Sequence, residues 1–150
     1  MAIEQSTTSE PCQCRAKAQR FSEYVRLHAS QDRLITEEAE RSVLRTGVGE
    51  FSLSLDEARG ILFSVADDRG IALESQADKH VADFLVHTSR KGRVSHKEFD
   101  AAVEFYRKLT RHALSESESR ARVKKVMERN DMKPRRNWAR LGSRRWYDKA

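Results

Sequence analysis

Hydrophobic residues recur at helical spacing through most of this 150-residue chain. Ala18, Phe21, Val25 and His28 fall on one face of a helix predicted over 15–29, with Tyr24 beside them. Four later segments carry similar stripes, each three or four residues apart. They are Ala39, Val43 and Leu44; Ala58, Ile61, Leu62 and Val65; Ala77, Val81, Phe84 and Leu85; and Phe99, Ala102, Val103 and Tyr106. A weaker stripe, Val123, Val126 and Met127, predicts a last helix.

Polar residues mark where these helices begin and end. Thr36 can cap the second helix, and Gly47 and Gly49 are expected to end it. A Ser followed three residues later by an acid forms a capping box, in which each side chain satisfies the other's free backbone amide. Four such pairs occur: Ser54–Glu57, Ser75–Asp78, Ser95–Glu98 and Ser115–Glu118.

The stripes and caps predict an all-α protein, a helical bundle of about five to six helices. Residues 1–14 are polar and are expected to form a disordered N-terminal arm. Residues 15–130 are expected to form one helical domain, and residues 131–150 a basic, aromatic C-terminal tail.

The segment from His87 to Phe99 resembles an EF-hand, a helix, a twelve-residue calcium loop and a second helix. With His87 at position one, Gly92 falls at position six, Val94 at eight and Glu98 at twelve. Counting back from Glu57 places a partner loop at 46–57, and the two hands would be 35–68 and 75–109. The resemblance implies that Leu53 and Val94 join in a short antiparallel ribbon. The pattern also resembles, more loosely, the helical TerB-like domain of tellurite-resistance proteins.

The calcium ligands of such a loop are replaced. Positions one, three and five hold His87, Ser89 and Lys91, where Asp or Asn is expected. Lys91 and Arg93 place positive charge where a dication would bind, and Glu98 is explained as a helix cap. We therefore expect an EF-hand-like fold that uses neither calcium nor any other cofactor.

Other candidate chemistry is sparse. His80, Asp83 and His87 share a helix face and could hold zinc or iron, but a solvated polar flank is the simpler explanation. Cys12 and Cys14 lack a second pair that would complete four ligands. Asp67 and Asp68 have no nucleophile near them in sequence and more simply close a helix. We therefore expect no metal site and no catalytic residues, so the protein is interpreted as non-enzymatic.

The C-terminal tail is the most unusual feature. The chain carries a net charge of +6, and residues 133–150 alone hold seven Lys or Arg and one Asp. These arginines are interleaved with aromatic residues, a composition that suits partner binding. The candidate binding residues are Arg135, Arg136, Trp138, Arg140, Arg144, Arg145, Trp146 and Tyr147. The simplest interpretation of the tail is that Trp138, Leu141 and Trp146 fold back on the helical bundle.

Two functional hypotheses follow. The first is a cytoplasmic protein-interaction module that engages another protein. The alternative is a small nucleic-acid-binding protein that uses arginines for phosphates and rings for unpaired bases. The longest apolar run, 60–66, is too short to cross a membrane, and no secretory signal is recognisable at the start.

Overall fold

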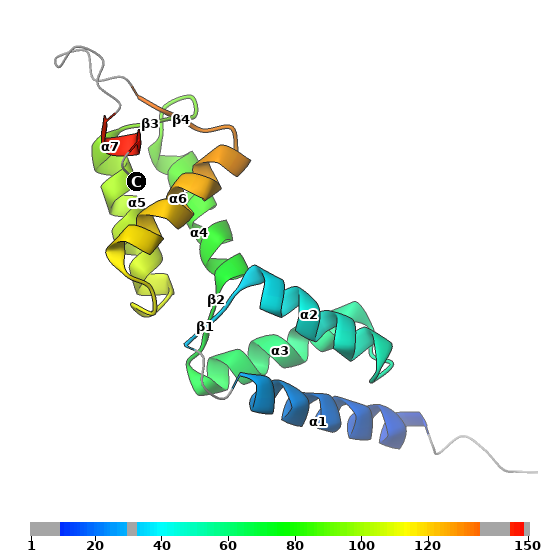
Figure 1. The fold of residues 1–150 in the computed structure, drawn as a ribbon. Coiled ribbons are helices and arrows are strands. Elements are labelled where there is room, and N and C mark those ends of the chain that lie inside the picture. The colour runs from blue at the N-terminus through cyan, green and yellow to red at the C-terminus, as the bar shows by residue number, and fades with distance from the viewer. Residues whose placement is uncertain (1–9, 30–32, 136–144, 149–150) are drawn as a thin grey trace, which may run out of the picture. The chain divides into compact units, whose positions relative to one another are not determined.

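A computed structural model of the chain describes residues 10–29, 33–135 and 145–148 (Figure 1). This part of the chain is mostly helical, as predicted, with seven helices and four strands of two residues each. It divides into two compact units, residues 1–71 and residues 72–150, where the sequence predicted one domain. Each unit has its own core.

The first unit is a three-helix arrangement. Its elements are α1 (Glu10–His28), β1 (Leu34–Ile35), α2 (Glu37–Gly49) and α3 (Leu55–Arg69). Helix α3 contacts both α1 and α2. The core side chains Phe21, Val25, Ala58, Leu62 and Val65 are almost completely buried. Helix α1 begins at Glu10, five residues before the predicted start, so part of the expected disordered arm is helical.

The second unit packs three long helices around one core. Its elements are β2 (Ala72–Leu73), α4 (Glu74–Thr88), β3 (Arg93–Val94), α5 (His96–Leu109), α6 (Glu116–Arg129), β4 (Lys133–Pro134) and α7 (Arg145–Asp148). Helices α4, α5 and α6 contact one another pairwise. The largest fully buried side chains here are Leu85, Phe99, Tyr106 and Met127. Helix α7 was not predicted from the sequence.

Three of the four predicted capping boxes are present, at Ser54–Glu57, Ser95–Glu98 and Ser115–Glu118. The fourth is wrong. Helix α4 begins at Glu74, directly after β2, and its N-cap Leu73 makes no side-chain hydrogen bond. Ser75 therefore lies inside the first turn of α4. The Glu74 side chain is buried and pairs with Arg122 of α6.

A second polar contact ties the three helices of this unit together. The Tyr106 hydroxyl of α5 donates a hydrogen bond to Asp78 of α4 at 3.1 Å. Arg129 of α6 reaches the other Asp78 oxygen at 3.3 Å. Burial raises the pKa of Asp78 above its ordinary value, against the Tyr106 hydrogen bond, which lowers it. Because a half-buried carboxylate needs partners, this network specifies how α4, α5 and α6 align.

Two strands join at one end of this unit (Figure 1). Strands β3 and β4 are parallel, with Arg93 beside Lys133 and Val94 beside Pro134. The Leu53 amide instead donates to the Gly47 carbonyl inside the first unit. The antiparallel ribbon expected between Val94 and Leu53 is therefore wrong, since Val94 pairs with the segment that follows α6.

Candidate nucleic-acid interface

A tight turn precedes β3. Lys91 and Gly92 both have positive φ, at 52° and 66°, and the Arg93 amide donates to the Arg90 carbonyl at 3.1 Å. Positive φ at both central residues defines a type I′ turn. The turn leads through the buried Val94 to Ser95, whose hydroxyl accepts a hydrogen bond from the Glu98 amide and so caps α5. Lys91 is exposed and lies at the tip of this turn.

Strand alternation separates apolar from charged residues at this end. Neighbouring residues of a strand point to opposite faces, and paired residues of adjacent strands share a face. Val94 points into the core, so Arg93 and its neighbour Lys133 point outward, and both are exposed. The Lys133 amide donates to the Gly92 carbonyl at 2.9 Å, and the Arg135 amide to the Val94 carbonyl at 2.7 Å. The backbone that carries these cations is therefore held in place.

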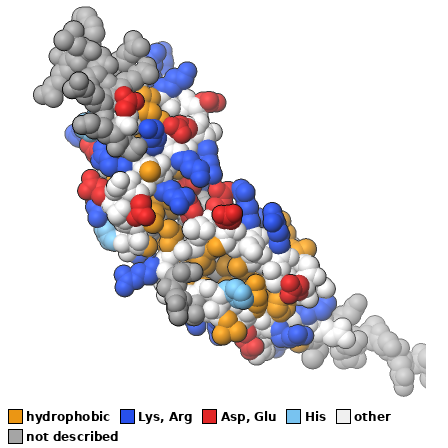
Figure 2. All heavy atoms as spheres, in the orientation of Figure 1, with side chains coloured by type: hydrophobic (Ala, Val, Ile, Leu, Met, Phe, Trp, Pro, Cys, Tyr) orange, Lys and Arg blue, Asp and Glu red, His pale blue; other side chains and the backbone are white. Residues whose placement is uncertain are grey.

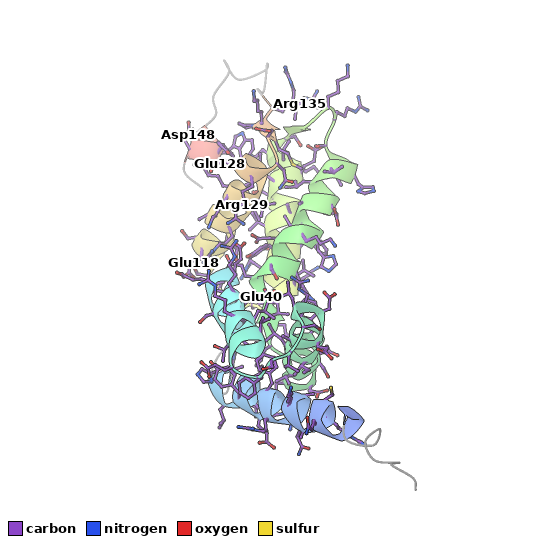
Figure 3. The ribbon with its side chains drawn as sticks, turned by 90° about the vertical axis from the view of Figure 1, so that its right-hand side faces the viewer. Glu40, Glu118, Glu128, Arg129, Arg135 and Asp148 are labelled. Carbon is purple, nitrogen blue, oxygen red and sulfur yellow. The ribbon has the colours of Figure 1, made fainter. Side chains whose placement is uncertain are left out.

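We call the five exposed cations Arg90, Lys91, Arg93, Lys133 and Arg135 the basic end. Within the part of the chain that the structure describes, none of the five forms an ion pair. Segments 89–95 and 131–135, which carry them, contain one acid, Asp131. Arg135 lies at the extremity of the second unit, where other nitrogen-tipped side chains project (Figure 3).

The aromatic residues of α7 lie against the core near the basic end. The Trp146 ring stacks on His96 with centroids 5.1 Å apart, and it contacts Phe99 at 5.2 Å. Tyr147 meets Phe99 edge-on at 6.5 Å. The Trp146 and Tyr147 side chains are half-buried. Trp146 therefore folds back on the bundle, as the simplest interpretation of the tail predicted.

Helix α6 holds α7 through polar contacts on either side of Tyr147. Lys124 donates to the Tyr147 carbonyl at 3.1 Å, and its ammonium lies 4.8 Å from the centre of the ring. The Tyr147 hydroxyl donates to Glu128 at 3.3 Å, and Figure 3 shows Glu128 on α6 below α7. Burial, followed by the charge of Glu128, raises the pKa of Tyr147 to about 12.

The predicted tail residues therefore fall into three groups. Arg135 belongs to the basic end, and Trp146 and Tyr147 pack on the bundle. Arg145 lies in α7, but its side chain is outside the described residues. Arg136, Trp138, Arg140 and Arg144, together with Leu141, also lie outside them. Sequence reasoning missed Arg90, Lys91, Arg93 and Lys133 as binding residues.

The predicted helix–loop–helix around 87–98 is present, since α4 ends at Thr88 and α5 begins at His96. The Glu98 carboxylate accepts from the Ser95 amide at 2.6 Å. The Nδ1 atom of His87 forms a hydrogen bond with the Asp83 carbonyl oxygen at 2.7 Å. Among the described residues, no three His, Cys, Asp or Glu side chains lie close enough to hold a metal ion. No helix in the same ranges has the length and apolar character needed to cross a membrane.

The first unit contains an apolar hollow of about 180 Å³ between α1, α2 and α3. Its lining includes Tyr24, Val25, Ile35, Ser42, Val43 and Leu62. On the face drawn in Figure 2, hydrophobic side chains gather over part of the α1–α3 unit, and charges of both signs lie over both units. Leu27 of α1 is 75% exposed.

Comparisons with protein-family models, with curated proteins and with solved structures found no match to this chain.

Proposed function

We propose that this protein is a helical, non-enzymatic nucleic-acid-binding protein that contacts phosphates through its basic end and does not use calcium. The observation that carries the proposal is the meeting of the turn cations with those of β4. The pairing of Arg93 with Lys133 brings together two segments about forty residues apart in the chain. The sequence showed the charge of each segment but not that the two segments meet.

Cations that form no ion pair with any described residue, and that stand on an ordered backbone, suit a phosphate chain. A cation that neutralises a phosphate releases a condensed counterion, so binding gains entropy at low salt. Arginine forks bind phosphate oxygens in pairs, while lysine acts as a point charge. Because β3, β4 and the type I′ turn are already hydrogen-bonded, binding has to order side chains only.

The test removes two charges from the basic end. Arg93→Gln with Lys133→Gln is compared with the wild-type chain by fluorescence anisotropy on a labelled 20-base-pair DNA. We expect the double substitution to weaken binding at least tenfold at 50 mM salt. The slope of log affinity against log salt concentration should become shallower by the equivalent of about two phosphate contacts.

A matched control removes two exposed cations from the other end of α5. Lys108 lies in its last turn and Arg111 just beyond it. Lys108→Gln with Arg111→Gln is expected to leave the affinity nearly unchanged. Equal losses in both double variants would mean that net charge alone drives binding. Binding to anionic phospholipid vesicles but to no nucleic acid would contradict the proposal.

The apolar hollow of the first unit favours a second candidate function, the docking of another protein. Its lining is mainly aliphatic, with Ser42 and His28 as polar members, and its volume suits one large apolar side chain of a partner. Anchors of this kind carry much of the energy of protein interfaces. The partner would therefore present an exposed leucine or aromatic residue on a helix or loop.

A pull-down with nuclease-treated lysate tests this second candidate. Ser42→Arg places a long charged side chain at the hollow and is expected to abolish capture of a specific protein. Arg93→Gln with Lys133→Gln should leave that capture intact, because the basic end lies in the other unit. Capture that both variants retain would exclude the hollow as the docking site.

A further inference from the structure

We infer that the basic end binds the phosphate backbone of a nucleic-acid duplex, and not unpaired bases, without reading sequence. This inference rests on the proposed function and specifies its ligand. DNA and RNA duplexes share the phosphate chemistry, and the experiment below separates them.

The two aromatic rings of the tail that the structure describes, Trp146 and Tyr147, argue against unpaired bases. Proteins that bind single strands stack successive bases on exposed aromatic faces beside a basic groove. Trp146 has His96 stacked on it with an interplanar angle of 24° and has Phe99 and Tyr147 as further neighbours. Tyr147 is held between Lys124 and Glu128. Both rings are half-buried and already have partners, so a base that stacked on either would compete with contacts that α7 makes.

The arrangement of the cations suits a backbone. Arg93 on β3 and Lys133 on β4 lie on neighbouring strands, roughly 4.8 Å apart, the usual strand spacing. Lys133 begins β4, and Arg135 directly follows the strand with its amide still bonded to the Val94 carbonyl. The alternation of an extended backbone therefore places these two side chains on one face. Arg90 and Lys91 extend the same charge around the turn. A duplex presents one charge per 1.7 Å of its axis, about twice the density of a single strand. It therefore attracts a compact group of cations more strongly than a single strand does.

Lys91 supplies an independent observation. Its φ of 52° is left-handed, a conformation that is unfavourable for a residue other than glycine. Asn-Gly is the preferred pair for a type I′ turn, because Asn tolerates this conformation better. A lysine at this tip is therefore unfavourable for folding, and its exposed charge is the property that distinguishes it from asparagine.

Lys91→Asn gives a sharp variant for this reason. It is expected to raise the melting temperature slightly while it weakens duplex binding, so loss of binding cannot be ascribed to loss of fold. The slope of the logarithm of affinity against the logarithm of salt concentration is expected near −4.5 for five contacts on a duplex. In this variant it should become less negative by the equivalent of about one contact. Lys108→Asn, near the far end of α5, is the control and should lower neither slope nor affinity.

The experiment titrates the full-length protein into labelled ligands of one sequence: duplex DNA, duplex RNA and the single strands of each. We expect at least one duplex to bind five-fold or more tightly than its single strands. Trp146→Phe, which keeps a ring for packing, should leave duplex affinity unchanged.

The outcomes distinguish the inference from the function on which it rests. Tighter binding to single strands, weakened about tenfold by Trp146→Ala, would overturn the duplex inference and keep nucleic-acid binding. An unchanged duplex affinity in Lys91→Asn would also overturn it. No binding to any of the four ligands at 50 mM salt would remove the proposed function itself.

Discussion

Gly47 shows how a single residue sets the spacing of the first unit. A Cβ placed on Gly47 would lie 2.8 Å from Cζ of Phe21 and 2.9 Å from Cβ of Ala58. Helix α2 therefore approaches α1 and α3 closely because this residue has no side chain. The sequence pattern predicted that Gly47 and Gly49 end α2; the helix ends at Gly49, and Gly47 lies inside its last turn. A glycine required for packing looks in sequence the same as a glycine that stops a helix.

Gly47→Ala should consequently destabilise the protein, although alanine is the better helix former. Overpacking is expected to exceed the helix-propensity gain and to lower the free energy of unfolding by about 1–2 kcal/mol. Gly60→Ala, also inside a helix but with open space around it, should raise that free energy by about 0.5–1 kcal/mol. Chemical denaturation measures both, and a stabilised Gly47→Ala protein would contradict the close approach.

At the scale of elements, the local capping signals were predictable and the long-range contacts were not. Ser54, Ser95 and Ser115 cap helices as predicted because a capping box involves four consecutive residues. Ser75 does not cap α4, because β2 leads directly into this helix and the helix already begins at Glu74. The basic end could not be predicted, since it depends on Arg93 meeting Lys133 across an intervening helical hairpin.

Helix α7 should be sensitive to alkaline pH through Tyr147. The folded state raises the pKa of this phenol from 10.0 to about 12, so it holds the proton more tightly than the unfolded state. The stabilisation that this represents is present below pH 10 and is lost as the pH rises through about 12.

Thermal unfolding at pH 9 and pH 11 measures this effect. The melting temperature of the wild-type protein should fall more between the two values than that of Tyr147→Phe, which has no proton to lose. Tyr24→Phe controls for a tyrosine of the other unit. Identical falls in wild type and Tyr147→Phe would show that α7 contributes nothing to this pH dependence.

For the whole molecule, the charge differs between the two units. Residues 1–71 hold 9 basic and 12 acidic residues, while residues 72–150 hold 20 basic and 11 acidic ones. The sequence, taken as one domain, predicted a neutral body with a basic tail. The division at Ile71 instead gives an acidic unit and a basic unit, so a polyanion is attracted to the second unit as a whole.

Calcium should leave the molecule unchanged. The loop that resembles an EF-hand presents Lys91 and Arg93, and its Glu98 carboxylate caps α5. Calorimetry with up to 1 mM calcium is expected to give no binding heat, and circular dichroism no change in helicity or melting temperature. A micromolar dissociation constant would contradict the charge argument.

Pro134 has a consequence for self-association. In the parallel pair, the amides of Lys133 and Arg135 point toward β3, so the nitrogen of the residue between them faces the open edge of β4. Proline has no hydrogen there to donate, and charged residues flank it on both sides. A third strand, from another copy or from a misfolded chain, finds no donor at that position. The β4 edge of the small sheet is thereby protected against edge-to-edge aggregation.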